Sequence, residues 1–295
     1  MLPAYAPTPL FPESELFDLL REVEDLGEML VERQPGVSFT YKADGSLLSA
    51  LDVEVQRRIR DHVRRSGPDE ARRAHFVGEE DDPTSDVSRA LVPGRWNWIV
   101  DAIDGTAAYI KGSNSFAIEI ALVDEKSRPV LGMIHLPAWQ RRFYVAWEGE
   151  LFRWADGRLT LEGRSSLPAE WRDRADAPVA RSYLYGNSDL HRRGLHTFGG
   201  KVRNLGGTAA HLALLADRTV DPIAVVVSRC EVWDVAGGLA LAEAAGIEVR
   251  RGSDWSVVDP AEIIGSPQIK NMLPIVLGLP EALRVLEPEL RGRLR

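Results

Sequence analysis

The stretch WNWIVDAIDGTAAYIKG, residues 96–112, contains the sharpest change of character in this sequence. Its Trp, Ile and Val residues predict a buried strand, and Asp101, Asp104, Gly105 and Thr106 follow within a few positions. A carboxylate is costly to bury unless something positive meets it. The strand therefore predicts a site at its end that pairs two aspartates with a cation, and a solvated turn is the alternative.

Apolar spacing on both sides of this strand predicts a mixed fold. Helices are expected from Leu16 to Leu30, from about Asp52, in GGTAAHLALLADR and in WDVAGGLALAEAAG, the last with Asp234 at its start and Gly246 at its end. Further strands are expected in AHFVG, SFAIEIALVD, RPVLGMIHLP, RFYVAWEGE and PIAVVVS. Because strands and helices do not alternate strictly, the pattern favours a layered α/β sandwich over a doubly wound parallel sheet.

Length and composition limit the classes of protein. The chain has 295 residues, 44% of them hydrophobic, which suits one large domain or two packed ones. A net charge of −8 argues against a nucleic-acid polymer as partner. A shift to Arg, Ser, Ala and Pro at residues 156–178 predicts a division into an N-terminal part, residues 1–160, and a C-terminal part, residues 161–295.

The location can also be predicted. The lone cysteine, Cys230, cannot form an intrachain disulfide and fits a reducing compartment. The Pro-rich start, expected to be an arm or loop up to Pro12, lacks the pattern of a signal peptide. No apolar stretch is long enough to span a membrane. We expect a soluble, cytoplasmic protein with no membrane partner.

Acidic residues recur where predicted strands end or a helix begins. They are Glu79, Glu80, Asp101, Asp104 and Asp234. Oxygen ligands of this kind suit Mg²⁺, and paired ions can clamp both oxygens of a displacement at phosphorus. Taken singly, each has an ordinary explanation as a turn, an exposed loop or a helix cap. Their order along the chain points instead to one metal site.

Five segments carry a resemblance to a known family: KADGSLLSALD (42–52), GEE (78–80), DAIDGT (101–106), GGTAA (206–210) and WDVAGGLALAEAAG (233–246). In order and spacing the chain resembles the inositol monophosphatase family of Mg²⁺-dependent, lithium-sensitive phosphatases, which is related to fructose-1,6-bisphosphatase. The resemblance implies an α-β-α-β-α sandwich and hydrolysis of a small phosphate ester by a metal-activated water. It also implies a homodimer.

The resemblance assigns roles to individual residues. The expected ligands of two or three Mg²⁺ ions are Glu79, Asp101 as the bridging carboxylate, the carbonyl of Ile103, Asp104 and Asp234. The residues expected to orient and deprotonate the attacking water are Thr106, Asp52 and Glu79. The expected substrate contacts are Gly105, Thr106 and Ala107 at the phosphate end, and Gly207 and Thr208 at the alcohol.

Four positions depart from the family pattern. Ala102 stands where the family usually has proline, which predicts a looser turn. Ala108-Tyr109 replaces the Asn-Phe of the inositol enzymes. Val227 occupies the place of an acidic residue that contacts an inositol hydroxyl, unless Glu231 substitutes for it. Inositol phosphate is therefore doubtful. DGTAAYIKG followed by FAIEIALV is also loosely similar to the branches that act on adenosine bisphosphates or histidinol phosphate.

Other residues have ordinary roles as the simpler expectation. Lys111 is expected to be solvated, although it could meet a second phosphate, and His211 is expected on a helix surface or partly buried. Trp98 and Cys230 are expected in the core, and Lys42 is either solvated or steadies the loop before Asp52. Two competing hypotheses remain: a family member that has lost turnover and acts as a binding or regulatory protein, and a metal-stabilised fold with unrelated chemistry.

Overall fold

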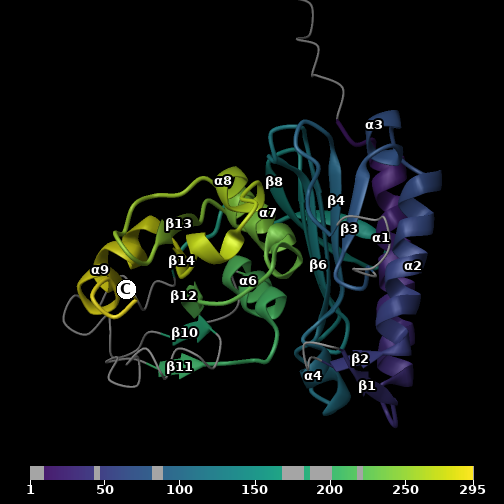
Figure 1. Ribbon diagram of the computed structural model, residues 1–295, viewed down its shortest axis with the longest axis horizontal. Coiled ribbons are helices and arrows are strands. Elements are labelled where there is room, and N and C mark those ends of the chain that lie inside the picture. The colour runs from purple at the N-terminus through teal and green to yellow at the C-terminus, as the bar shows by residue number, and fades with distance from the viewer. Residues whose placement is uncertain are drawn as a thin grey trace, which may run out of the picture.

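The computed structural model describes residues 10–42, 47–81, 89–167, 183–186, 201–217 and 222–294. Within them, helices and sheets alternate in five layers (Figure 1). The layers are α1 (Glu13–Arg33) with α2 (Ala50–Arg65), a seven-stranded sheet, α6 (Thr208–Ala216) with α7 (Ala236–Ala245), a five-stranded sheet, and α9 (Pro280–Leu290). The predicted α-β-α-β-α sandwich is confirmed.

The outer helices α1 and α2 each bury one apolar stripe against the first sheet. Leu16, Leu20 and Ile59 have no exposed surface, and they pack in one core with Trp98 of the sheet. A capping box starts α2, because the Ser49 N–H donates to Asp52 Oδ2 at 2.8 Å. A short hairpin precedes it, made of β1 (Phe39–Tyr41) and β2 (Leu47–Ser49).

The seven-stranded sheet carries the WNWIVDAID segment near one edge. Its order is β3 (His75–Gly78), β4 (Asn97–Asp104), β5 (Ala117–Val123), β6 (Pro129–Leu136), β7 (Arg142–Trp147), β8 (Glu150–Ala155) and β9 (Arg158–Leu161). Only the β3–β4 pair is parallel. Every residue of β4 and β5 is buried, since helices cover both faces of the sheet.

Alternation along β4 and β5 determines which side chains point toward α1 and α2 and which point toward α6 and α7. Trp98 and Val100 belong to the core under α1 and α2, whereas Ile99 belongs to the core shared with α6 and α7. Asp101 continues the row of Ile99 and lies opposite Glu119 of β5 in the register. Both carboxyl side chains therefore start from the inner face.

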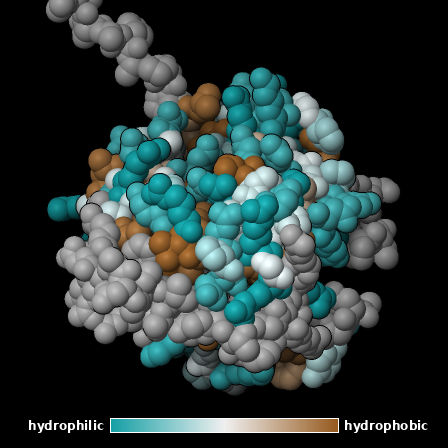
Figure 2. All heavy atoms as spheres, turned by 90° about the vertical axis from the view of Figure 1, so that its left-hand side faces the viewer, coloured by the Kyte–Doolittle hydropathy of each residue, from teal (hydrophilic) through white to brown (hydrophobic). Residues whose placement is uncertain are grey.

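The five-stranded sheet is built from the C-terminal part of the chain. Its order is β11 (Lys201–Arg203), β10 (Tyr183–Gly186), β12 (Pro222–Val227), β14 (Ile275–Gly278) and β13 (Glu248–Arg251). The helix α9 covers its outer face and shares a third core with it. Figure 2 views the molecule from this side, where hydrophilic side chains cover most of the described surface with small hydrophobic patches between them.

Two expectations need correction. The segment from Trp233 to Gly246 is not one helix: a 3-10 turn, η3 (Val232–Asp234), precedes α7, and Gly246 with φ 75° ends it. Strands β8 and β9 were not expected, and β9 lies inside the stretch assigned to a boundary at 156–178. Most of that stretch, and the Pro-rich start before Leu10, lie outside the described residues. The division at residues 160 and 161 stays a prediction. Among the described residues, no helix combines the length and apolar character needed to cross a membrane.

Candidate active site

Three aspartates from distant parts of the chain meet beside the end of β4. Asp101, Asp104 and Asp234 each offer a carboxylate oxygen, and these oxygens lie within 4.8 Å of one another. Asp101 and Asp104 flank an irregularity in the β4–β5 register, and Asp234 ends η3. The structure therefore brings these three predicted site residues together.

Backbone groups orient each of the three side chains. The Ile103 N–H donates to Asp101 Oδ1 at 3.0 Å, and the Glu231 N–H donates to Asp234 Oδ2 at 2.7 Å. Asp104 accepts from the Thr208 N–H at 3.1 Å and the Ala209 N–H at 2.9 Å, which are the first donors of α6. Asp104 thus caps a helix of the other half of the chain, and the helix dipole favours its negative charge.

Two glycines allow this close approach. Gly105 has φ 81°, a left-handed conformation that turns the chain from β4 into the short helix α4 (Thr106–Ile110). A Cβ at Gly207 would lie 2.2 Å from Asp104 Oδ2. A side chain at position 207 would therefore push the Asp104 carboxylate out of place.

Burial strongly disfavours the charged forms of these carboxyl groups. It raises the pKa of Asp104 to about 7, and the backbone hydrogen bonds from α6 only partly oppose it. Burial, together with the charges of neighbouring carboxylates, also raises the pKa of Asp101 and Asp234 well above the ordinary range. A bound divalent cation would offset this repulsion, and an all-oxygen set of donors suits a hard ion.

We expect the metal-free protein to lose stability as pH rises from 5.5 to 8. Between the ordinary aspartate pKa of 3.8 and the raised pKa of Asp104, about 7, the folded chain holds a proton that the unfolded chain has released. Stability therefore falls with pH through this window. Thermal melts in a chelator should show a fall of at least about 3 °C, and excess Mg²⁺ should remove it. A melting temperature that rises over this range would contradict the assignment.

Glu79 lies at the end of β3 but is not one of the three clustered carboxylates. Its Oε1 accepts from Lys42 Nζ at 2.8 Å, and the same ammonium bonds Glu80 Oε1 at 2.6 Å. Burial, followed by the charge of Glu79, raises the pKa of Glu80 to about 7. The structure thus pairs the predicted ligand Glu79 with Lys42, and Lys42 is neither solvated nor idle.

The turn that carries Glu79 and Glu80 is supported by buried polar contacts. Asp81 Oδ2 accepts from the Gly78 N–H at 3.1 Å, and its Oδ1 accepts from Gln56 Nε2 at 3.0 Å. Gln56 Oε1 in turn accepts from the Glu80 N–H at 2.8 Å. These contacts tie the turn to α2, the helix that also carries Asp52.

Asp52 and Thr106 meet as a pair. The Thr106 hydroxyl lies 3.1 Å from Asp52 Oδ1 and 3.1 Å from the Ile103 carbonyl, either of which can accept its proton. Asp52 has no exposed surface, and burial raises its pKa. A hydroxyl that donates to a carboxylate can accept a hydrogen bond from a water molecule, so this pair can serve as a proton acceptor.

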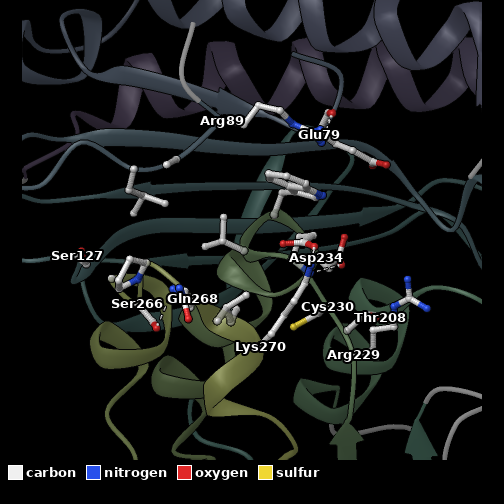
Figure 3. A pocket seen from close by; sticks show the side chains of 18 of the residues that line it. Glu79, Arg89, Ser127, Thr208, Arg229, Cys230, Asp234, Ser266, Gln268 and Lys270 are labelled. Atoms are coloured by element: carbon white, nitrogen blue, oxygen red, sulfur yellow. Dashed lines mark hydrogen bonds and ion pairs between the residues drawn. The ribbon is translucent and has the colours of Figure 1, made fainter. Parts of the chain in front are cut away.

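A cavity of about 2190 Å³ opens over the cluster. Glu79, Asp104, Thr208 and Asp234 line it, and Figure 3 shows Glu79 and Asp234 on facing walls. Four of the expected substrate contacts are absent from the described lining of this cavity: Gly105, Thr106, Ala107 and Gly207. Cationic side chains on its walls are Lys42, Arg89, Lys126, Arg229 and Lys270.

The residues that depart from the family pattern have clear surroundings. Tyr109 is fully buried, and its hydroxyl donates to the Leu30 carbonyl at 2.8 Å. Val227 has no exposed surface, while Glu231 lies on the cavity wall and pairs with Lys270 Nζ at 2.7 Å. Ala102 is buried in β4, and Lys111 is exposed as expected. Val227 does not line the cavity, whereas Glu231 does.

One of the residues with an expected ordinary role is buried more deeply than predicted. His211 is 1% exposed on α6, not on its surface, and its Nε2 accepts from the Leu205 N–H at 2.8 Å. Cys230 is buried, as predicted, and lines the cavity. Trp98 is in the core, which confirms that prediction.

Two residues of the site were missed. Glu119 on β5 is 1% exposed, accepts from the Gly238 N–H of α7 at 2.9 Å, and has its pKa raised well above the ordinary range by burial. A single acid inside the apolar run FAIEIALV was the signal that could have revealed it. Arg89 donates from Nη2 to the Glu79 carbonyl at 2.7 Å, and no local pattern marks it.

Comparison with known proteins found a family model, curated relatives and solved structures that this chain resembles. The model of the inositol monophosphatase family matches residues 18–272. The 3'(2'),5'-bisphosphate nucleotidase CysQ of Escherichia coli K12 is 29% identical over 247 residues, 82% of this chain and 89% of that protein. The fructose-1,6-bisphosphatase/inositol-1-monophosphatase of Thermotoga maritima is 28% identical over 230 residues, 77% of this chain and 80% of that protein. A solved Thermotoga maritima IMPase superposes with a TM-score of 0.69 at 22% identity, covering 95% of this chain and 96% of that one.

Proposed function

The chain belongs to the inositol monophosphatase family, and from that premise we propose that it hydrolyses small phosphate monoesters with the help of Mg²⁺. The observation that carries the proposal is the cluster of Asp101, Asp104 and Asp234, whose oxygens lie within 4.8 Å of one another. The cavity of about 2190 Å³ that opens over it leaves room for a phosphorylated metabolite. The substrate class is a sugar, polyol, nucleotide or amino-alcohol phosphate.

The proposed ligands of two or three Mg²⁺ ions are Glu79, Asp101, the Ile103 carbonyl, Asp104 and Asp234. When bound, such ions supply charge neutralisation at the phosphate and a more acidic water. The donor set fits them, because every donor is an oxygen and the buried carboxyl groups are destabilised without a cation. Glu79 would have to exchange its bond to Lys42 for the ion.

The chain's own groups would do the remaining work. Thr106 and Asp52 orient the attacking water and accept its proton, since they already form a hydrogen-bonded pair. Backbone N–H groups of Gly105 and Thr106, and the adjacent Ala107, hold the phosphate, as oriented donors at a turn can do. Gly207 and Thr208 contact the alcohol. Together these groups position and stabilise the transferred phosphoryl group without a covalent intermediate.

A nucleotide bisphosphate is the leading substrate. CysQ proteins, which match this chain over 82% of its length, are named for that activity. Val227 cannot accept a hydrogen bond from an inositol hydroxyl, which argues against inositol phosphate. The walls of the cavity also carry Lys126, Arg229 and Lys270, which suit a substrate with more than one phosphate.

Phosphate release across a panel of esters tests the proposal. The panel holds adenosine 3',5'-bisphosphate, inositol 1-phosphate, histidinol phosphate, 5'-nucleotides and sugar phosphates, each with and without Mg²⁺. We expect one ester to be strongly preferred and its hydrolysis to require Mg²⁺. A protein that binds Mg²⁺ in calorimetry but releases no phosphate from any ester would instead favour the alternative of a binding or regulatory protein. The bond between Glu79 and Lys42 is the observation that motivates this alternative.

The expected homodimer and cytoplasmic location stay predictions. Sedimentation of the purified chain at several concentrations would measure the first, and fractionation of the source cells would measure the second.

A further inference from the structure

Arg89 spans the cavity between two turns that carry proposed metal ligands. On one side its Nη2 donates to the Glu79 carbonyl at 2.7 Å. On the other side its Cζ lies 4.6 Å from the centre of the Trp233 ring, within the range of a cation–π contact. Figure 3 shows Arg89 beside Glu79 on the wall that faces Asp234. One guanidinium thus contacts the neighbour of Asp234 and the backbone of Glu79.

The two groups that Arg89 contacts are themselves fixed by other parts of the fold. Glu79 is fixed to the sheet by a hydrogen bond from its N–H to the Val100 carbonyl at 3.1 Å. Trp233 is 8% exposed and lies in the same 3-10 turn as Asp234. The loop that follows Arg89 is anchored by Asn97, whose Oδ1 accepts from the Val92 N–H at 2.9 Å. Arg89 therefore links two supported turns rather than two free loops.

The rest of the Arg89 guanidinium makes no further hydrogen bond among the described residues. Arg89 Nε is buried and has no hydrogen-bond partner among the described residues. Within the described contacts, the side chain touches no clustered carboxylate directly. A cation placed beside a cation site repels the ion, so its presence needs a compensating role.

We propose that Arg89 is a positioning residue that sets the distance between the Glu79 turn and the Asp234 turn, and so raises the affinity of the site for its divalent cation. This inference rests on the proposed function, because it concerns the same metal site. Groups that orient metal ligands without binding the metal typically change affinity 10- to 100-fold when they are removed. The guanidinium suits this task because it can stack on a ring and donate in its own plane at once.

Calorimetric titration of Mg²⁺ into the metal-free protein tests the proposal, because charge and position predict opposite signs. We expect Arg89→Met to weaken Mg²⁺ binding about 10-fold or more. If Arg89 mattered only as a nearby positive charge, its removal would tighten binding, and an unchanged or tighter Kd overturns the proposal. Lys126→Met is the matched control: it removes one exposed positive charge from the same cavity without touching either turn. Its Kd should stay equal or fall.

A conservative variant separates position from charge and guards against misfolding. Arg89→Lys keeps the charge but cannot stack as a plane while donating to the Glu79 carbonyl, so we expect it to bind Mg²⁺ nearly as weakly as Arg89→Met. Full rescue by lysine overturns the proposal, and this variant alone decides if Arg89→Met does not fold. Circular dichroism without metal reports folding. Adding Trp233→Phe to Arg89→Met should weaken binding little further, because the two share one contact.

The result for the unmodified chain keeps the two proposals apart. If the wild-type protein fails to bind Mg²⁺ at all, the proposed function falls, and the role of Arg89 falls with it. If the wild type binds Mg²⁺ and Arg89→Met binds it as well or better, only the role of Arg89 is overturned.

Discussion

Asp104→Asn is expected to lower kcat/KM for phosphate release at least about 10³-fold, because it removes a carboxylate of the proposed metal site and replaces it with a weaker neutral donor. Stabilisation by a metal is worth several kcal/mol in such reactions, and about 1.4 kcal/mol is a factor of ten. The side chain keeps its size and one acceptor oxygen. Since Asp104 now accepts from both Thr208 and Ala209, the variant loses one of these bonds.

The effect on folding should be small by comparison. The lost bond to α6 costs about 1–3 kcal/mol, and the removal of a buried charge from a repulsive cluster offsets part of it. Circular dichroism should therefore show the native fold, and calorimetry should show much weaker Mg²⁺ binding. Asp61→Asn, on the outer surface of α2, is a control that should keep full activity. Near-normal turnover by Asp104→Asn would show that the metal assignment is wrong.

Thr106→Val is expected to lower kcat about 10²- to 10⁴-fold while KM changes little. Valine fills the same space but has no hydroxyl to hand a proton from water to Asp52, whose carboxylate lies 3.1 Å away. Thr106→Ser restores the hydroxyl and should keep most of the activity. Mg²⁺ binding by Thr106→Val should match that of the wild type, which separates this defect from loss of the metal.

The partner of Thr106 gives a second measurement. Asp52→Asn should lower kcat as much as Thr106→Val does. The double variant should lower kcat little further, because the two groups act as one unit. Burial raises the pKa of Asp52, so the rising limb of the kcat–pH profile should lie above the ordinary pKa of aspartate. That limb should disappear in Asp52→Asn. Additive losses in the double variant would contradict a shared proton path.

The sequence was sufficient for the fold and for the centre of the site, because both depend on local patterns. The run of Trp, Ile and Val before Asp101 predicts the buried strand, and Gly105 after Asp104 predicts the turn that ends it. The order of five short motifs then identifies Asp234 as their partner. These patterns can be recognised in the sequence because each one spans only a few residues.

The contacts that were missed are made between distant segments. Lys42 was expected to be solvated or to steady a loop, but it bonds Glu79, 37 positions away. Arg89 reaches a ring on Trp233 from a loop whose own sequence has no periodicity. The break between η3 and α7 could not be predicted either, since Val235 has as good an apolar fit to the helix as its neighbours. Tertiary packing, not propensity, decides such positions.

The bond between Asp104 and the first turn of α6 also fixes when the site can exist during synthesis. Asp104 leaves the ribosome before α6, and Asp234 follows 130 positions after it (234 − 104). A chain stopped after Leu161 but before Asp234 has all strands of the first sheet but cannot assemble the three-aspartate cluster. Ion binding would then stabilise only a chain whose two halves have docked. Removal of the ion should open the contact between Asp104 and α6 before it unfolds either sheet.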